Sequence, residues 1–340
     1  MLRAVVSPDK FRGSLDAMAA AAAIATGLTR GGYDEVAQVP MADGGDGTLQ
    51  VLAAVLGGSW RSVTVDGPLG RPVDAGWLML PGGTAAIEMA RASGLALVAG
   101  HNDPLRASTR GTGQLIDAAR TAGCRQLVVA VGGSATTDGG LAAIEALHWS
   151  LGGVDTTVAC DVQTRFVDAA DVYGPQKGAS PAQVGLLRRR LEMLADQYEA
   201  RTGVDVRVID GAGAAGGLAG GLAALGARIE PGFDVVANAV GLDDQLEGCD
   251  LVVTGEGRLD APSLEGKVVG GVLDAAAAAG VEYRVVICGV ADRETREQLE
   301  ADGVRVLTLV DRAWDRDDAY TRAALLCEEA ALEAARAITT

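Results

Sequence analysis

The chain has 340 residues, of which 49% are hydrophobic and 22% are charged. This length corresponds to about two domains of roughly 150 residues each, and the composition excludes a disordered chain. No apolar run reaches the roughly 18 residues that a membrane span needs, and the first residues lack the apolar segment of a signal peptide. The formal charge of −16 argues against nucleic acid or an anionic membrane as a partner.

Residue types that commonly carry chemistry are scarce. Five scattered cysteines without a CxxC pair are typical of reduced thiols in a cytoplasmic protein. The only histidines, His101 and His148, leave little material for histidine metal sites or Ser-His and Cys-His nucleophiles. The 29 basic residues include three lysines, Lys10, Lys177 and Lys267, each in a loop-like context. Because lysine and arginine differ in shape and hydration, we interpret these lysines as point charges in tight sites.

Short apolar runs alternate with Ala- and Leu-rich stretches along the chain. The predicted strands are 4–6, 36–39, 127–131, 204–209, 251–254, 285–287 and 304–309. The predicted helices are 14–29, 112–122, 181–202, 269–279 and 318–338. Strands that are short, β-branched and continuously apolar are typical of sheets buried on both faces. The alternation therefore predicts a parallel α/β sheet built from right-handed units.

One region breaks this alternation and predicts a second lobe. Turn residues between 63 and 98 indicate hairpins. We expect a Rossmann-like parallel-sheet domain made of residues 1–61, 108–150 and 240–340. A smaller α/β lobe, made of residues 62–107 and 151–239, is expected to be inserted into it. The fold class is then α/β, with the active site expected in the cleft between the two lobes.

Glycine clusters follow the predicted strands. The chain has 47 glycines, and clusters of them lie in the loops 7–14, 41–48, 132–140, 211–217 and 254–260. Ligands of open parallel sheets bind at the carboxyl ends of the strands, where glycine lets backbone N–H groups approach a phosphate. The residues predicted to bind a nucleotide are Gly44, Gly45, Gly132, Gly133, Ser134, Thr136, Gly211, Gly213, Gly216 and Lys267.

Carboxylates accompany the glycines in three of these loops. Because Mg²⁺ is held by one or two carboxylates together with phosphate oxygens, Asp46, Asp138 and Glu256 are the predicted metal ligands. Phosphoryl transfer also needs positive charge on the migrating phosphate and a carboxylate that orients the acceptor hydroxyl. The candidates are Lys177, Arg12 and Arg258 for the charge, and Asp43 or Asp260 for the carboxylate.

Of two known nucleotide-binding patterns, one is absent from the sequence and the other is present. The Walker pattern GxxxxGK[ST] is absent, because Ala261 stands where its first glycine should be. The segment GAGAAGG at 211–217 matches GxGxxG, and Glu230 and Asp234 lie near the expected acidic position. An NAD-dependent dehydrogenase is therefore an alternative. The mid-chain location and the lack of a nearby His or Lys/Tyr acid–base pair weigh against it.

Taken together, the loops resemble the motif series of the type-1 glycerate kinase family. The matching segments are SPDKFRGSL, PMADGGDGT, GGSATTDGG, ACDV, YGPQKGAS, GAGAAGGL, and TGEGRLD followed by GK. The resemblance implies a two-lobed α/β enzyme that uses ATP and Mg²⁺ to phosphorylate D-glycerate, with 2-phosphoglycerate the favoured product. We expect glycerate and ATP as partners and a cytoplasmic location, and we leave a homodimer open.

The resemblance also assigns individual residues and shows departures. By position, the residues on the family's motifs are Asp9, Arg12, Ser14, Asp43, Asp46, Ser134, Thr136, Asp138, Asp161, Gln176, Lys177, Glu256, Arg258, Asp260 and Lys267. The family usually has a longer segment between Leu151 and Cys160, and an Asn-Pro pair after Val162 that is missing here. Both changes fall in the expected inserted lobe, so a kinase for another small hydroxy-acid is the second alternative.

Overall fold

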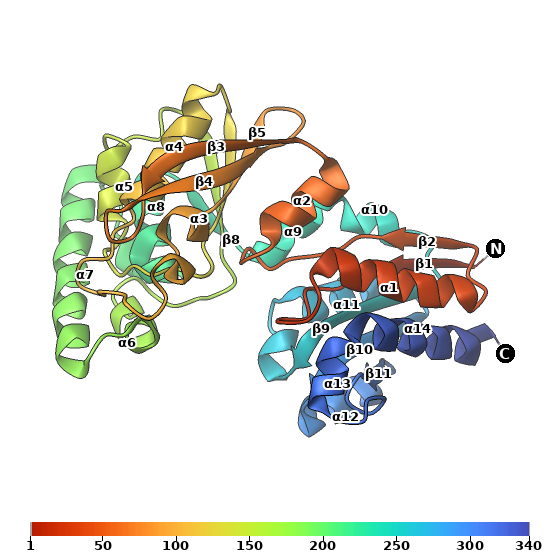
Figure 1. Ribbon diagram of the computed structural model, residues 1–340. Helices are drawn as coiled ribbons and strands as arrows, with labels where there is room; N and C mark the ends of the chain where they lie inside the picture. Colours follow the sequence, from red (N-terminus) through yellow and green to blue (C-terminus); the bar gives the residue numbers. More distant parts are fainter. Residues whose placement is uncertain (1, 340) are drawn as a thin grey trace. The chain divides into compact units, whose positions relative to one another are not determined.

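The structure is a computed structural model in which residues 2–339 are described (Figure 1). The chain divides into two compact units. Unit 1 consists of Met1–Asp43, Gln50–Val55 and Phe233–Thr340, and unit 2 of Gly44–Leu49 and Leu56–Gly232. No helix in the described part of the chain is both long enough and apolar enough to span a membrane.

Unit 1 is built on a five-stranded parallel sheet. In spatial order its strands are β11 (Arg305–Thr308), β10 (Tyr283–Ala291), β9 (Leu251–Leu259), β1 (Arg3–Val6) and β2 (Glu35–Gln38). Ala4 of β1 lies opposite Val36 on one side and Leu251 on the other. The chain first adds β2 on one side of β1 and later adds β9 on the other, so the strand order reverses at β1 and β9.

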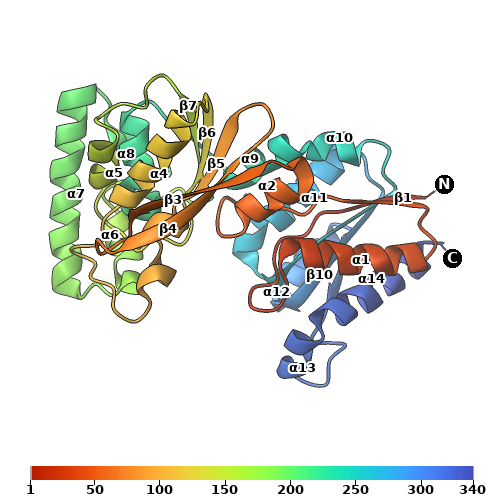
Figure 2. The same cartoon turned by 45° about the horizontal axis from the view of Figure 1, so that its top comes forward.

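The strands of unit 1 are apolar on both faces because helices cover both. Val285 and Ile287 of β10 pack in one layer with α1 (Ala17–Arg30) and α14 (Ala323–Thr339). The alternate residue Val286 packs in the opposite layer with α11 (Val268–Ala278) and α12 (Arg293–Ala301). Both views show α1 and α14 side by side (Figures 1 and 2). Their close contact explains the small residues of α1.

Unit 2 contains a six-stranded mixed sheet and the longest helix of the described chain. Its strands in spatial order are β3 (Ser59–Asp66), β4 (Pro72–Met79), β5 (Thr84–Glu88), β6 (Gln126–Ala130), β7 (Asp155–Ala159) and β8 (Arg228–Glu230). Strands β3 to β5 are antiparallel neighbours, as the hairpin signals predict, and β5 to β8 are parallel. The parallel pairs in both sheets confirm the predicted α/β class.

The remaining helices and turns complete the two units. In unit 2 they are α3 (Ala90–Ser93), η1 (Leu95–Val98), α4 (Arg110–Thr121), α5 (Leu141–Ala146), α6 (Ala169–Tyr173), η2 (Pro175–Lys177), α7 (Pro181–Thr202), η3 (Val206–Val208), η4 (Ala214–Gly217) and α8 (Leu218–Ala224). In unit 1 they are α10 (Leu242–Leu246), η5 (Ala261–Leu264) and α13 (Arg316–Thr321). Two helices contribute residues to both units: α2 (Thr48–Leu56) and α9 (Gly232–Val240).

The structure places residues 108–150 in unit 2, whereas the sequence analysis assigned them to the Rossmann-like domain. The reason is the pairing of β6, whose Leu127 lies opposite Ala85 of β5 and Thr156 of β7. A short apolar strand looks the same from its sequence whichever buried sheet it joins. The element was therefore predicted, but its partners were not.

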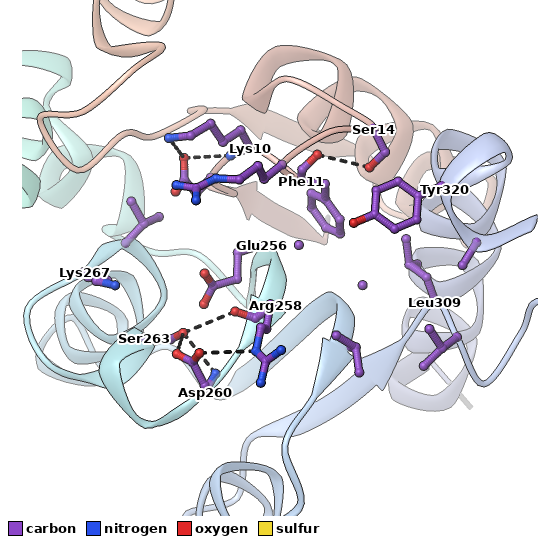
Figure 3. Close-up of a pocket in the computed structure, with 18 of the residues that line it drawn as sticks. Lys10, Phe11, Ser14, Glu256, Arg258, Asp260, Ser263, Lys267, Leu309 and Tyr320 are labelled. Atoms are coloured by element: carbon purple, nitrogen blue, oxygen red, sulfur yellow. Dashed lines mark hydrogen bonds and ion pairs between the residues drawn. The ribbon is translucent and has the colours of Figure 1, made fainter. Parts of the chain in front are cut away.

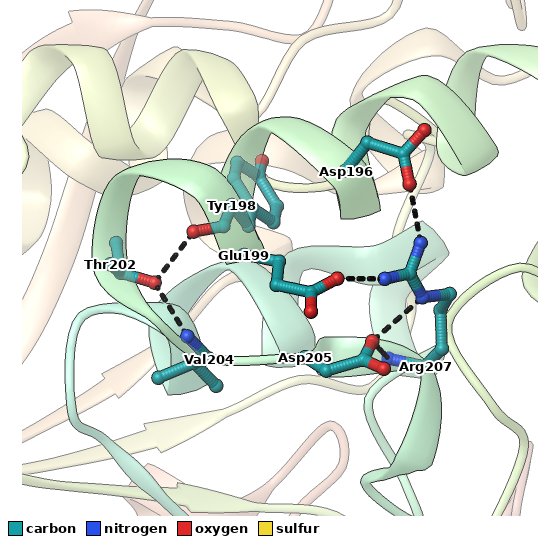
Figure 4. Close-up of polar contacts among 7 residues, drawn as sticks. All are labelled: Asp196, Tyr198, Glu199, Thr202, Val204, Asp205 and Arg207. Carbon is teal, nitrogen blue, oxygen red and sulfur yellow. Dashed lines mark hydrogen bonds and ion pairs between the residues drawn. The ribbon is translucent and has the colours of Figure 1, made fainter.

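The predicted strand at 204–209 is wrong, because this segment forms the 3₁₀ turn η3. Figure 4 shows the side chains that fix the turn. Oδ1 of Asp205 accepts hydrogen bonds from the backbone N–H of Arg207 at 3.0 Å and from its Nε at 2.7 Å. The same guanidinium pairs with Asp196 and Glu199 on α7. These contacts fold the β-branched segment against α7 instead of extending it. The last predicted helix, 318–338, is also two helices, α13 and α14.

Candidate active site

A pocket of about 500 Å³ lies at the carboxyl ends of the unit 1 strands. Its walls come from the loop Asp9–Ser14 after β1, the segment Glu256–Val268 at the end of β9, and residues at the ends of β10 and β11 (Figure 3). Strands β1 and β9 flank the position where the strand order reverses. Open α/β sheets bind their ligands at such a switch point.

This pocket gathers six of the predicted site residues from distant parts of the sequence. They are Arg12, Asp43, Glu256, Arg258, Asp260 and Lys267. Lys10 lines the pocket as well. Two of the three lysines of the chain therefore line one pocket, as point charges in tight sites would.

The acidic end of the pocket is formed by partly buried carboxylates. Oδ1 of Asp9 accepts a 2.7 Å hydrogen bond from the backbone N–H of Lys10. Burial raises the pKa of Asp9 to about 6, and the negative charge of Asp43 adds to the rise while Lys10 opposes it. Burial likewise raises the pKa of Glu256 to about 7, with the charge of Asp9 adding to it. Oε1 of Glu256 is buried and has no hydrogen-bond partner among residues 2–339.

Asp260 is engaged in local structure at the pocket wall. Ser263 Oγ donates to Asp260 Oδ1 at 3.2 Å, and the backbone N–H of Asp260 donates to Ser263 Oγ at 3.1 Å. This reciprocal arrangement caps the turn η5. The second carboxylate oxygen of Asp260 lies 3.4 Å from Nε of Arg258. The sequence left Asp43 and Asp260 as equal candidates for orienting an acceptor hydroxyl.

The other predicted site residues belong to unit 2. They are Gly44, Gly45, Asp46, Gly132, Gly133, Ser134, Thr136, Asp138, Lys177, Gly211, Gly213 and Gly216. Asp46 is exposed at the surface. The sequence analysis grouped Asp46, Asp138 and Glu256 as metal ligands, and the structure places the first two in unit 2 and the third in unit 1.

The glycine loops of unit 2 touch one another through their backbones. A Cβ atom on Gly132 would lie 2.7 Å from Cα of Gly45. A Cβ atom on Gly216 would lie 2.0 Å from the carbonyl oxygen of Thr136, and Gly216 has a φ of +67°. Only glycine fits such approaches without moving the backbone. The loops 44–48, 132–140 and 211–217 are therefore brought together.

Lys177 and Asp138 hold the loop 132–140 in place. Lys177 is only 3% exposed, and its Nζ donates a 2.6 Å hydrogen bond to the carbonyl oxygen of Thr136. Burial lowers the pKa of Lys177 to about 7, and the charge of Asp138 opposes the shift. Oδ2 of Asp138 accepts hydrogen bonds from the backbone N–H and the hydroxyl of Thr109, both at 2.8 Å, and Oδ1 accepts from Gly140 at 3.2 Å. Burial raises the pKa of Asp138.

Glu88, at the end of β5, was missed by the sequence analysis. It is 3% exposed, and its Oε1 accepts hydrogen bonds from the backbone N–H groups of Gly47 at 3.0 Å and Leu49 at 3.1 Å. Its Oε2 accepts a 2.7 Å hydrogen bond from Nε of Arg91. Glu88 thereby fixes the loop 44–48 to the start of α2. The available signal was a carboxylate at the end of an apolar strand, three residues before an arginine.

The dehydrogenase alternative loses its structural basis. The dinucleotide-binding motif needs a strand directly before the glycines and a helix after them. The turn η3 precedes GAGAAGG, and the motif itself contains the turn η4. The match to GxGxxG therefore reflects close packing of the loop against its neighbours.

The fold and the pocket define an α/β protein with a pocket at the switch point of a parallel sheet. The profile of the glycerate kinase family matches residues 4–153 and 147–339. The glycerate 2-kinase of Escherichia coli (strain K12) is 38% identical, over 85% of each chain. The glycerate kinase of Bacillus subtilis (strain 168) is 37% identical, over 99% of this chain and 98% of its own.

A solved structure gives the same assignment. The crystal structure of putative glycerate kinase 2 from Salmonella typhimurium LT2 is similar over 99% of this chain and 98% of that one, with a TM-score of 0.84 and 31% identity. The chain belongs to the glycerate kinase family, whose members are ATP-dependent kinases.

The two segments matched by the family profile meet at residues 147–153. The sequence analysis finds the chain shortened just after this point. The structure has a compact turn there, in which His148 and Trp149 take positive φ values of 51° and 61°. The guanidinium of Arg201 on α7 lies 3.7 Å from the ring centroid of Trp149. The short connection is thus packed against α7.

Proposed function

We propose that this chain transfers the γ-phosphoryl group of ATP to a hydroxyl group of glycerate. The observation that carries the proposal is the pocket at the switch point, which joins partly buried carboxylates to basic side chains in a chain of this family. Phosphoryl transfer needs this combination of positive charge and a carboxylate near the acceptor hydroxyl.

The carboxylates of the pocket fit Mg²⁺, which accompanies ATP in our proposal. Two buried carboxylates with raised pKa values, Asp9 and Glu256, one of them with an unpartnered buried oxygen among residues 2–339, match the oxygen ligands of this ion. Glu256, as predicted, and Asp9 would hold the ion. When bound, Mg²⁺ neutralises charge on the phosphate oxygens. No group of three or more His, Cys, Asp or Glu side chains suited to a metal occurs among residues 2–339, and Mg²⁺ on ATP needs only one or two.

In the proposed reaction the carboxylate of Asp43 orients the acceptor hydroxyl of glycerate and accepts its proton. A bond forms between the hydroxyl oxygen and the γ-phosphorus, and the bond from that phosphorus to the β–γ bridging oxygen breaks. ADP then leaves with that oxygen. Arg12 and Arg258 supply positive charge to the migrating phosphate or to the glycerate carboxylate. Lys267 binds the nucleotide.

The residues of unit 2 have a supporting part in this proposal. The glycine loops stay predicted to bind nucleotide phosphates. Asp46 and Asp138 stay predicted as metal ligands, although the contacts of Asp138 with Thr109 and Gly140 already use both of its oxygens. Lys177 acts on the reaction by positioning the loop 132–140, since its ammonium group is buried against Thr136.

The position of phosphorylation follows from the relatives. The Escherichia coli relative is named a glycerate 2-kinase, which supports 2-phosphoglycerate as the product. The shortened connection between Leu151 and Cys160 favours the second candidate, a kinase for another small hydroxy-acid. The two candidates share their chemistry and differ in the acceptor.

The test is ADP release in the presence of Mg²⁺-ATP and D-glycerate, with the product then offered to enolase without a mutase. ADP release followed by enolase turnover establishes a glycerate 2-kinase. ADP release without enolase turnover places the phosphate at the 3-position. If glycerate elicits no ADP and another hydroxy-acid does, the chemistry of the proposal stands and its acceptor is wrong.

Two further parts of the proposal concern the cellular compartment of the protein and its oligomeric state. The five cysteines are all buried and unpaired, which supports a reducing compartment such as the cytoplasm. A homodimer remains a prediction, which light scattering on the purified protein tests.

A further inference from the structure

The pocket of unit 1 has two ends of different chemistry. Figure 3 shows Lys10, Glu256 and Lys267 toward one end and Leu309 and Tyr320 toward the other. The second end also includes Phe11, Val310 and Ala319. We call these five residues, Phe11, Leu309, Val310, Ala319 and Tyr320, the apolar wall.

Tyr320 is the exposed member of the apolar wall. Phe11 and Leu309 are each 1% exposed because they pack into the core of unit 1, whereas Tyr320 is 58% exposed. An aromatic side chain exposed to this degree at a pocket presents apolar surface that a ligand can cover. The hydroxyl of Tyr320 has no hydrogen-bond partner in the described part of the chain and leaves a polar group for the same ligand.

The position of the Tyr320 ring is supported by the elements around it. Gly13, in the loop after β1, lies beneath the ring, since a Cβ atom at Gly13 would be 3.3 Å from Cε1 of Tyr320. Helix α13 is capped by Asp315, whose side chain accepts a 2.8 Å hydrogen bond from the backbone N–H of Asp318. Asp318 also pairs with Arg322 at 3.0 Å. The ring is therefore presented from a fixed helical turn.

The substrates of the proposed reaction differ in their need for such a wall. Glycerate has three carbons, all bearing oxygen, so it has no apolar surface to bury. The base of a nucleotide has a flat π-face, and an aromatic side chain binds such a face by stacking. A pocket of about 500 Å³ is also much larger than glycerate and is within the range of nucleotide-sized ligands.

We propose that the apolar wall is the base subsite of the nucleotide, that Tyr320 stacks on the base, and that the phosphates extend toward Glu256 and Lys267. The inference rests on the proposed function in one respect, namely that the phosphate donor is a nucleotide. It adds that the base lies in the pocket of unit 1 and names the side chain that recognises it.

The test measures binding of ADP to the full chain by calorimetry, separately from activity. We expect Tyr320→Ala to weaken ADP binding about tenfold, the scale of lost base stacking. Tyr320→Phe should bind ADP within about twofold of the original chain, because it keeps the aromatic face. Inorganic tripolyphosphate, which has no base, should bind Tyr320→Ala and the original chain equally.

Trp314→Ala is the matched control, because Trp314 is an exposed aromatic residue just before α13 that does not line the pocket. It should leave ADP binding unchanged. If Tyr320→Ala binds ADP as Trp314→Ala does, or weakens tripolyphosphate as much as ADP, the base subsite is refuted. If ADP binding depends on Tyr320 but glycerate is not phosphorylated, the subsite stands and the proposed acceptor fails.

Discussion

The ammonium group of Lys177 donates a 2.6 Å hydrogen bond to the carbonyl oxygen of Thr136 from a position that is almost fully buried. Burial lowers the pKa of this lysine from 10.5 to about 7. Between these two values the folded chain has released a proton that the unfolded chain still binds. The contribution of Lys177 to the stability of the fold therefore rises as the pH increases across this interval.

Replacing Lys177 by methionine tests this relationship. We expect the free energy of unfolding of the original chain, minus that of Lys177→Met, to be larger at about pH 9.5 than at about pH 7. Urea unfolding at the two pH values measures the difference, and taking it between two chains cancels the other titrating groups. An equal difference at both pH values would contradict the lowered pKa of Lys177.

Asp43 is predicted to matter for turnover and little for folding. Asp43→Asn removes the proposed proton acceptor while keeping the size of the side chain. We expect kcat to fall by roughly a hundredfold or more, with a melting temperature close to that of the original chain. The matched variant is Asp260→Asn, which weakens the cap of η5 and the pairing with Arg258 and should lower the melting temperature as well. A normal kcat for Asp43→Asn would show that another group accepts the proton.

Glu88 is predicted to position the loop 44–48. Glu88→Ala leaves the N–H groups of Gly47 and Leu49 and the guanidinium of Arg91 without their acceptor, and we expect a loss of about 2–3 kcal/mol in the free energy of unfolding. We also expect kcat to drop about tenfold, since the loop after Asp43 loses its anchor. Glu88→Gln retains one acceptor oxygen and should lose less of both. Urea unfolding and steady-state kinetics measure the two effects, and a folded Glu88→Ala with full kcat would argue against a positioning role.

Alanine substitutions at Gly216 and Gly226 distinguish the stability cost of close packing from that of backbone strain. Both have positive φ, +67° and +97°, but a Cβ at Gly216 would meet the carbonyl oxygen of Thr136 at 2.0 Å, whereas one at Gly226 meets nothing within 4 Å. We expect Gly226→Ala to cost about 1–2 kcal/mol from strain alone. Gly216→Ala should cost well above that, about 4 kcal/mol, because backbone must move. Equal losses by thermal unfolding would mean that the loops 132–140 and 211–217 are less tightly joined.

Much of the site was predictable because it depends on a local rule. The carboxyl ends of buried parallel strands meet at one sheet edge. This rule brings Asp9 and Asp43, which follow β1 and β2, and Glu256, in the last half of β9, to the pocket of unit 1. The carboxylates and glycines were found because their residue types are informative by themselves. The helix 181–202 was predicted with the bounds that the structure has, since Ser180 and Gly203 mark its ends.

The parts that failed depend on contacts between distant residues. Nothing within 127–131 says that this strand pairs with β5 and β7 rather than with the strands of unit 1. The sequence of the segment 204–209 is typical of a strand. The segment forms a turn because Arg207 pairs with acidic residues of α7. Tyr320 was overlooked because a polar stretch such as RDDAYT resembles the exposed start of a helix. Its place in the pocket follows only from the turn between α13 and α14.

The scarcity of lysine has a practical chemical consequence. Of the three lysines, Lys177 is buried, while Lys10 and Lys267 line the pocket of unit 1. Apart from the amino group at the start of the chain, the reachable primary amines of the described residues therefore line this pocket. An acylating reagent such as an activated ester, which on most proteins decorates the whole surface, would here act as an affinity-like label of the pocket. A bound nucleotide would shield the same two side chains from it.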